Sequence, residues 1–342
     1  MTRIRGASDE HDPPPGVEAG SVVTVFRVPA EHAGQRVDLF VQAHLHRTSR
    51  TRAQAIVRAS AYDGDGRKLD PNDRVRPDQT VLLWRAPWDE APVPLDVPTI
   101  YEDAHLLAVD KPAGLPVHPT ARYHKNTLIK VLERQRPDCA FLSLGHRLDR
   151  ETSGVMLVSK TRACDRALKK ALEARADIEK TYLAITWGAP DRGDGATTFR
   201  LERSMEIDLE GSVRVKMRLS DAPSAQYAAT VFRLEETRRS ESGRLYALVR
   251  CNLETGRQHQ IRLHLSSLGT PVVGDKLYGP DERAFARSAD GELTEADSVM
   301  LELPRHALHA AKLALAHPIT GQRLTLEAPL PRDLSDFWAS LR

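Results

Sequence analysis

A proline-rich segment, residues 87–98, divides the chain into two unequal parts. Prolines stand at positions 87, 92, 94 and 98 of the stretch PWDEAPVPLDVP. Because proline fixes φ and lacks a backbone N–H, such a stretch favours an extended linker over a helix or an inner strand. The sequence therefore predicts a small domain at 22–86, the linker at 87–98 and a larger domain at 99–342.

The part before the linker is predicted to be a small α/β module. Apolar and β-branched runs at 22–26 and 81–84 indicate strands, and residues 36–41 and 50–59 indicate two short helices. The first 21 residues are polar, contain three consecutive prolines and show no periodicity. We expect them to form a disordered tail.

In the part after the linker, strands follow one another more often than they alternate with helices. The predicted elements are a helix at 161–176 and strands at 106–109, 182–187, 228–234 and 245–253. This order favours an α+β fold with a mixed, mostly antiparallel central sheet flanked by helices, over a doubly wound parallel sheet. The polar, acidic stretch 281–298 is predicted to be a surface insertion.

Cysteine usage and charge exclude several classes of protein. Cys139, Cys164 and Cys251 are far apart and form no CxxC pair, which disfavours a disulfide framework and a zinc site and favours a cytoplasmic location. No apolar run is long enough to span a bilayer, so we expect no membrane partner. The formal net charge of +2 gives no global sign of a polyanionic partner.

Residues 46–58 carry four arginines and no acid. Three of these arginines and Gln54 recur at spacings of three and four, so they share a helical face, and Ser49 can cap the helix. Ala53, Ile56 and Val57 would face the core. A bare basic face is more often simply solvated, with RNA binding as the alternative. The candidate RNA-binding residues are Arg47, Arg50, Arg52 and Arg58.

The segment 146–154, HRLDRETSG, is the most informative one for chemistry. It places Asp149 on a loop directly before the apolar run 155–158, which we predict to be a buried strand. A loop carboxylate held against a rigid element suits a catalytic site. A structural ion pair with a neighbouring arginine is nevertheless the more common role for such an aspartate.

Three other chemistries fit this region poorly. A triad of His146, Asp149 and Ser153 lacks the G-x-S-x-G elbow and would need three residues of one loop to converge. Asp149 and Glu151 could form a glycosidase pair, but side chains two residues apart need not point together. His259 and His264 are five apart, not the four of a helical zinc pair.

Two further segments carry polar residues at functional spacing. Residues 180–184, KTYLA, open a predicted strand whose period of two puts Lys180 and Tyr182 on one face. Residues 253–264, LETGRQHQIRLH, place His259 and Arg262 three apart on a predicted helical turn. Each segment alone is as readily structural as functional.

Taken together, these segments closely resemble the RluA family of pseudouridine synthases. HRLDRETSG, EKTYLA and TGRQHQIRLHL occur in the family order, and 106–119 (LLAVDKPAGLPVHP) and 269–279 (GTPVVGDKLYG) resemble flanking family segments. The resemblance extends over nearly all of the chain from residue 99 onward. In the small part, GQRVD at 34–38 and TSRTR at 48–52 resemble an S-four-type RNA-binding module, although Ser60 replaces a usual glycine.

The RluA resemblance implies an isomerase that converts uridine within RNA into its C-glycoside, with no metal and no cofactor. It implies that Asp149 is the essential carboxylate, which either attacks the anomeric carbon or assists formation of a glycal. It further implies that Arg262 is the ion-pair partner of Asp149 and that the ring of Tyr182 packs on the uracil. The residues predicted to bind substrate are Arg147, Lys180, His259 and Gln260.

Our main prediction is therefore an RNA pseudouridine synthase. The S-four-type module favours ribosomal RNA of the large subunit, with transfer RNA second; pre-ribosomal particles are a candidate partner and the chain is expected to be a monomer. A non-catalytic RNA-binding or ribosome-assembly factor is the rival, opposed by the joint presence of Asp149, Tyr182 and Arg262. A small-molecule nucleosidase or glycosidase would not need the basic helix.

Overall fold

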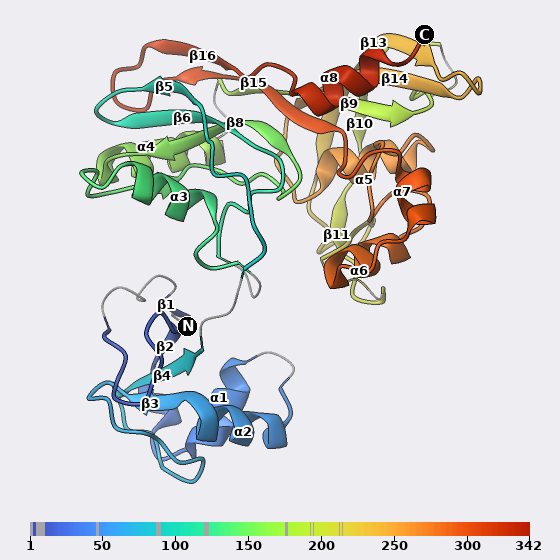
Figure 1. Cartoon of the computed structure of the whole chain (residues 1–342). Helices are drawn as coiled ribbons and strands as arrows, with labels where there is room; N and C mark the ends of the chain where they lie inside the picture. The colour runs from blue at the N-terminus through green and yellow to red at the C-terminus, as the bar shows by residue number, and fades with distance from the viewer. Residues whose placement is uncertain are drawn as a thin grey trace. The chain divides into compact units, whose positions relative to one another are not determined.

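The computed structural model divides the chain into two compact units, a small unit, Met1–Glu90, and a large unit, Ala91–Arg342 (Figure 1). It describes residues 3–4, 11–45, 48–86, 90–119, 123–174, 177–191, 193, 195–211, 213 and 215–342. Each unit is treated by itself. Within the described ranges, no helix combines the length and the apolar character needed to cross a bilayer.

The small unit is an antiparallel sheet in the order β1-β2-β4-β3, with both helices packed on one face. Its elements are β1 (Arg3–Ile4), β2 (Val22–Arg27), a 3-10 turn (Ala30–His32), α1 (Val37–His44), α2 (Arg50–Ser60), β3 (Ala61–Asp63) and β4 (Thr80–Arg85). The predicted strands and helices thus lie close to their expected positions. The S-four-type assignment of this unit stays a prediction.

Helix α2 begins where the sequence provides a cap. The side chain of Ser49 accepts a hydrogen bond from the backbone N–H of Arg52 at 3.2 Å, which satisfies one of the free donors of the first turn. Ala53 and Val57 are buried in the core and Ile56 packs against it. The predicted apolar face of this helix is therefore confirmed.

The first 21 residues are more ordered than we expected wherever the structure describes them. Arg3–Ile4 pairs with β2, and residues 11–21 form turns in which Pro14 is buried. Val17 packs against the cluster that contains Val23 and Trp84, on the sheet face opposite the helices. The few apolar residues of this segment thus have a surface to cover, which its polar composition did not indicate.

The large unit is built on a ten-stranded mixed sheet in the order β10-β13-β14-β9-β15-β8-β6-β5, with β16 beside β15 and β7 beside β8. Among the described strands, β8 and β15 are parallel neighbours and the other pairs are antiparallel. This confirms the predicted α+β fold. The strands are β5 (Thr99–Glu102), β6 (Leu106–Lys111), β7 (Ser143–Leu144), β8 (Ser153–Ser159), β9 (Glu179–Trp187), β10 (Thr198–Glu202), β13 (Ala229–Arg239), β14 (Leu245–Leu253), β15 (Leu308–Ala316) and β16 (Arg323–Glu327), and a separate hairpin consists of β11 (Met205–Ile207) and β12 (Met217–Leu219).

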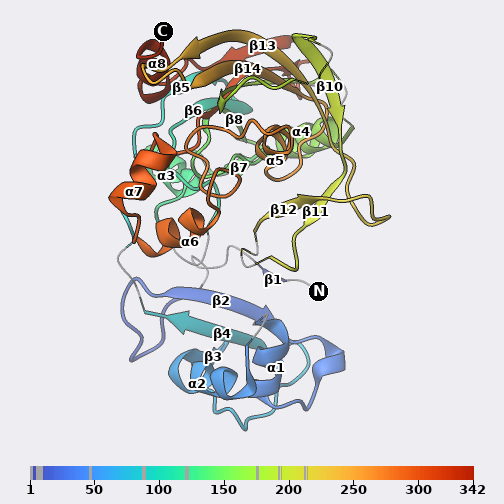
Figure 2. The ribbon, with the colours of Figure 1, turned by 90° about the vertical axis from the view of Figure 1, so that its right-hand side faces the viewer.

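Helices cover both faces of this sheet, and Figure 2 shows its β13–β14 part arching over α5. On strands β6 and β8, helix α3 packs against one face and α4 against the other. Both faces of the sheet are thus covered there, as the fully buried strand β8 requires. The helices are α3 (Leu128–Gln135), α4 (Arg162–Ala174), α5 (Gln260–Ser267), α6 (Arg283–Asp290), α7 (Glu295–Leu301) and α8 (Arg332–Ala339).

Strand β8 anchors the loop that precedes it. All seven of its residues are buried, with Val155 and Leu157 on the α4 face and Met156 and Val158 on the other. Residues 155–158 are therefore the buried strand that the sequence predicts. This strand is central and packed on both faces. The loop 146–152, which leads into it, is therefore anchored at a rigid end.

The linker differs from the prediction, and the predicted insertion contains helices that its composition did not indicate. The second half of the presumed linker packs on the large unit: Val97 is buried in its core, and Gln135 donates to the carbonyl of Leu95 at 3.1 Å. Residues 87–89 of the linker lie outside the described residues. The presumed surface insertion 281–298 contains α6 and the start of α7, and a bidentate ion pair between Arg287 and Asp297 joins these two helices.

Candidate active site

The loop before β8 brings Asp149 against Arg262 of α5. Arg262 Nη1 donates a hydrogen bond to Asp149 Oδ2 at 2.8 Å. The Arg262 side chain is almost completely buried, whereas that of Asp149 keeps 28% of its exposure. No described residue donates a hydrogen bond to Asp149 Oδ1. One carboxylate oxygen is thus held by the protein and the other is left for a substrate.

Asp275 holds the rest of the Arg262 guanidinium. Arg262 Nε and Nη2 donate to its two carboxylate oxygens at 2.6 and 2.7 Å. Asp275 is fully buried and also accepts from the backbone N–H groups of Leu277 and Tyr278. A guanidinium has donors in a fixed plane, so this bidentate contact leaves Nη1 to point at Asp149.

These contacts decide the charge state of Asp149. Burial alone would favour the neutral acid, yet the pKa of Asp149 lies below its usual value because His259 and Arg262 face the carboxylate. Arg262 is the permanent cation, since Asp275 and Asp149 outweigh its own burial and raise its pKa. Asp149 is therefore a carboxylate at neutral pH, as nucleophilic or basic action requires.

His259 lies on the other side of the same oxygen. It precedes α5 in a left-handed backbone conformation with φ of 58°, a strained state for a residue that is not glycine. Its Nε2 is 3.9 Å from Asp149 Oδ2, and its Nδ1 is 3.0 Å from the hydroxyl of Tyr278. Burial lowers the pKa of His259 to about 4, so its imidazole is neutral at neutral pH.

Tyr182 of β9 is buried close to the charge of Asp149. Burial raises the pKa of its phenol, and the negative charge of Asp149 raises it further. The hydroxyl therefore stays protonated, and it can donate a proton or a hydrogen bond but cannot act as a base at neutral pH. Lys180, two residues earlier, lies near His146, whose pKa falls to about 3 through burial and then through the Lys180 charge.

The two remaining predicted substrate residues differ in their placement. Arg147 is exposed on the Asp149 loop, and its side chain pairs with no described residue, which leaves it available to a ligand. Gln260 is buried and saturated inside the protein. It accepts from Thr255 and Arg257 and donates to Ala229 and Thr230. We therefore correct the assignment of Gln260: its amide orders the start of α5 and has no group left for substrate.

A second set of buried contacts fixes the backbone of the Asp149 loop. Lys276, next to Asp275, donates to Glu151 at 2.8 Å, and the hydroxyl of Thr152 bonds His306 at 2.8 Å. Arg305 donates to the carbonyl of Glu151 at 3.2 Å. The loop is thus held from the α5–α6 connection and from the segment before β15.

Lys111 also holds the backbone of the Asp149 loop. Its fully buried ammonium donates to the carbonyls of Pro112, Leu115 and Arg150 at 2.8, 2.9 and 3.1 Å. Arg150 directly follows Asp149 in the chain. Burial lowers the pKa of Lys111 to about 7, although the negative charge of Asp149 opposes this change.

The structure does not assemble the three alternative sites. His146 accepts from the backbone of Leu157 and Ser153 bonds His309, so neither joins Asp149 in a triad. Glu151 is engaged by Lys276 and His306 instead of facing a shared substrate position with Asp149. His264 bonds Thr230 and the carbonyl of Arg203, away from His259.

In the small unit, part of the basic face of α2 is used internally. Asp38 of α1 is fully buried, accepts two hydrogen bonds from Arg36 and one from Gln54, and lies 3.7 Å from Arg50. Arg50 and Gln54 therefore lean toward α1. Arg52 and Arg58 are exposed and pair with no described side chain, and Arg47 lies outside the described residues.

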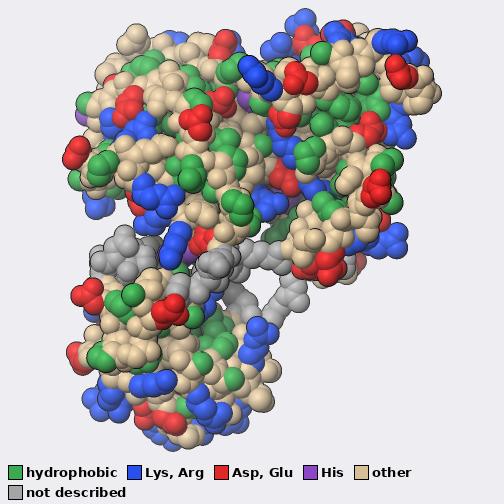
Figure 3. All heavy atoms as spheres, in the orientation of Figure 1, with side chains coloured by type: hydrophobic (Ala, Val, Ile, Leu, Met, Phe, Trp, Pro, Cys, Tyr) green, Lys and Arg blue, Asp and Glu red, His purple; other side chains and the backbone are tan. Residues whose placement is uncertain are grey.

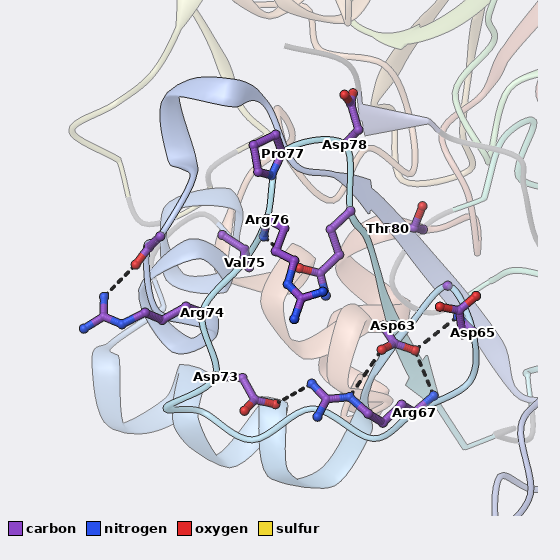
Figure 4. A pocket seen from close by; sticks show the side chains of 13 residues that line it. Asp63, Asp65, Arg67, Asp73, Arg74, Val75, Arg76, Pro77, Asp78 and Thr80 are labelled. Atoms are coloured by element: carbon purple, nitrogen blue, oxygen red, sulfur yellow. Dashed lines mark hydrogen bonds and ion pairs between the residues drawn. The ribbon is translucent and has the colours of Figure 1, made fainter.

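Surface charge does not mark a single binding path. Figure 3 shows basic and acidic side chains interspersed over the face it draws. A hollow in the small unit, between the loops 63–67 and 73–80, has the same mixed character (Figure 4). There Arg67 pairs with both Asp63 and Asp73, so the opposite charges neutralise each other. We assign no binding role to it.

The neutral histidines lead to a prediction on pH. Burial lowers the pKa of both His259 and His306 to about 4, so neither changes charge between about pH 5 and 6.5. We expect the single-turnover rate to be level over this range. An acid limb with an apparent pKa near 6.5, measured in single-turnover assays, would contradict the burial argument. Above this range Lys111 adds a group that titrates near 7.

Comparisons with known proteins agree with this geometry. A family model described as RNA pseudouridylate synthase matches residues 105–267, the stretch that holds Asp149, Tyr182 and Arg262. The chain is 35% identical over 321 residues to "Ribosomal large subunit pseudouridine synthase D" of Xanthomonas campestris pv. campestris, covering 92% of this chain and 91% of that relative. The protein of the same name from Pseudomonas aeruginosa is 35% identical over 323 residues, covering 92% and 94%.

The fold also has a counterpart among solved structures. The structure of "Human RNA Pseudouridylate Synthase Domain Containing 1" superimposes with a TM-score of 0.56 at 22% sequence identity. The match covers 73% of this chain and 90% of the human one. At this identity the likeness concerns the fold alone and does not extend to substrate.

Proposed function

The chain belongs to the RluA family of pseudouridine synthases, and we propose that it isomerises specific uridines of large-subunit ribosomal RNA. Family membership makes it an isomerase that acts on RNA. The observation that carries the proposal within the site is the half-engaged carboxylate of Asp149. Arg262 holds Oδ2 while Oδ1 accepts no hydrogen bond from a described residue.

The reaction that we propose exchanges one bond for another. The N1–C1′ bond of uridine breaks, the uracil turns over, and a C5–C1′ bond forms, while C5 loses a proton and N1 gains one. In this scheme Oδ1 of Asp149 either attacks C1′ or takes a proton from the ribose on the glycal route. Because Tyr182 keeps its proton, its hydroxyl can donate a proton or a hydrogen bond on either route. Its ring packs on the base in both.

The ribosomal target is supported by the relatives and by the exposed arginines. The relatives with 35% identity carry large-subunit names and span the small unit as well. We propose that Arg147 contacts RNA at the position the extruded base vacates, and that Arg52 and Arg58 grip phosphates. Transfer RNA is the second candidate substrate. Pre-ribosomal partners, a monomeric state and a cytoplasmic location belong to the same proposal.

Direct mapping tests the proposal. Purified protein is incubated separately with unmodified large-subunit RNA, with precursor particles that contain it and with unmodified transfer RNA, and pseudouridines are mapped in each. We expect a small number of defined sites in the large-subunit RNA or its particles. Modification of transfer RNA alone would replace the ribosomal assignment, and absence of pseudouridine from all three would remove the proposed activity.

Replacing the two free arginines of α2 tests the role of the small unit. We expect Arg52→Ala with Arg58→Ala to weaken binding of long RNA roughly tenfold and to lower the salt slope of the affinity by about 2, because two phosphate contacts are lost. A matched variant, Arg166→Ala with Lys170→Ala, removes two exposed charges from α4. Equal weakening by both variants in filter-binding titrations would show that net charge alone is responsible.

A further inference from the structure

The hydroxyl of Tyr278 is the hydrogen-bonding partner of His259, and its surroundings limit how protons are shared. The backbone N–H of Met217 donates to this oxygen at 2.8 Å. The phenol has one proton of its own, with two acceptors in reach: His259 Nδ1 at 3.0 Å and the carbonyl of Met217 at 3.4 Å. The shorter contact favours donation to His259.

The charge of Asp149 selects the same arrangement. If Tyr278 donates to Nδ1, the proton of the neutral imidazole is on Nε2, the atom that lies 3.9 Å from Asp149 Oδ2. In the opposite arrangement a lone pair of Nε2 would face a carboxylate, which is electrostatically unfavourable. The doubly protonated form is absent at neutral pH, because burial lowers the pKa of His259 to about 4.

Tyr278 is itself fixed by the group that holds Arg262. Its backbone N–H donates to Asp275 at 3.0 Å, and its ring lies under the Arg262 guanidinium, with 5.2 Å between the guanidinium carbon and the ring centroid. The ring also meets that of His259 at an interplanar angle of 76°. The phenol oxygen therefore has little freedom to move away from Nδ1.

We propose that Tyr278 is a positioning residue that fixes His259 as the neutral Nε2–H tautomer, so that this N–H serves as a hydrogen-bond donor to an oxygen of the bound uridine beside Asp149. The distance of 3.9 Å is too long for a direct hydrogen bond to Asp149, which leaves the donor to the ligand. This inference rests on the proposed function for its ligand, but the tautomer itself is a property of the free protein.

The tautomer is tested without any substrate. Full-length protein labelled with 15N-histidine is examined by long-range proton–nitrogen correlation at neutral pH, with the His259→Gln variant used to assign the signals. We expect Nε2 of His259 to carry the proton and Nδ1 to be unprotonated. A protonated Nδ1 would overturn the proposal, even if the enzyme proves to be an active pseudouridine synthase.

Kinetic measurements on a Tyr278 variant test whether this tautomer matters for turnover. Tyr278→Phe keeps the ring and removes the donor, so we expect both tautomers in the spectrum and a kcat lowered about tenfold, with KM for RNA unchanged. Tyr246→Phe is the matched control. Tyr246 lies on β14, and the substitution removes its hydroxyl, which donates a hydrogen bond to Glu302 at 2.6 Å. We expect this control to keep the wild-type kcat.

The effects of substituting Tyr278 and His259 should not be additive. In the Tyr278→Phe, His259→Gln double variant we expect no further loss beyond that of His259→Gln, because Tyr278 acts through His259. Additive losses, or a raised KM for RNA with unchanged kcat, would assign Tyr278 a structural role instead. If the wild type shows the expected tautomer but modifies no RNA, the proposed function fails while the assignment of the tautomer stands.

Discussion

Asp149→Asn is expected to abolish isomerisation, with a loss of at least about 10⁴-fold in the single-turnover rate. An amide has the shape of the carboxylate but can neither attack C1′ nor accept the ribose proton. The variant should fold, because removing one of the two acids on Arg262 leaves a charge-balanced pair with Asp275. We therefore expect RNA affinity within a few-fold of wild type.

A neighbouring acid supplies the control for this substitution. Glu151 lies on the same loop but pairs with Lys276 and accepts a hydrogen bond from the backbone N–H of His306. At a temperature where both variants are folded, we expect Glu151→Gln to keep a measurable rate of isomerisation while Asp149→Asn does not. Turnover by purified Asp149→Asn, or equal inactivation by both substitutions, would remove Asp149 from its assigned role.

Gly154→Ala is expected to lower the free energy of unfolding of the large unit by about 4 kcal/mol or more. Gly154 is the second residue of β8 and has a φ of 111°, a conformation that L residues rarely adopt. A Cβ at this position would lie 2.2 Å from the carbonyl oxygen of Ala310, its neighbour in the parallel strand β15. Backbone cannot yield as a flexible side chain can, so the two strands would have to separate.

Gly269 separates the two causes of this loss. It has a positive φ of 75°, but a Cβ there would meet nothing within 4 Å. We expect Gly269→Ala to cost only the backbone strain, about 1–2 kcal/mol. Denaturant titrations of both variants measure the difference. Equal destabilisation by the two substitutions would show that the approach of Ala310 is unimportant.

Local patterns sufficed for much of the fold. The continuous apolar run Val155–Val158 predicted a buried strand, and the Ser49 cap with Ala53 and Val57 predicted α2. Short apolar signals were missed: Val17 in the supposed tail and Val97 in the supposed linker are held by clusters that linear composition does not reveal. Polar composition likewise hid the helices of 281–298, which ion pairs of Arg287 stabilise.

The sequence predicted the site residues that lie in recognisable motifs, but not the pairings between distant segments. The sequence indicated Asp149, Tyr182 and Arg262, and the structure brings the first and last into contact. Gln260 was assigned to the substrate through the resemblance alone, and the structure shows its amide saturated inside the protein. Asp275 and Tyr278 stand in the GDKLYG segment, but no local periodicity relates positions 275 and 278 to positions 262 and 259. Such pairings depend on chain folding between them.

The parallel pairing of β8 with β15 also sets the order in which the enzyme can be completed during synthesis. The loop of Asp149 is held by His306 and Arg305 and by a strand that begins at Leu308, more than 150 positions later. A nascent chain that has emerged only through α7 contains Asp149, Tyr182 and Arg262 but lacks the strand that fixes their loop. Residues as far along the chain as β15 must therefore be synthesised before the loop of Asp149 is held in place.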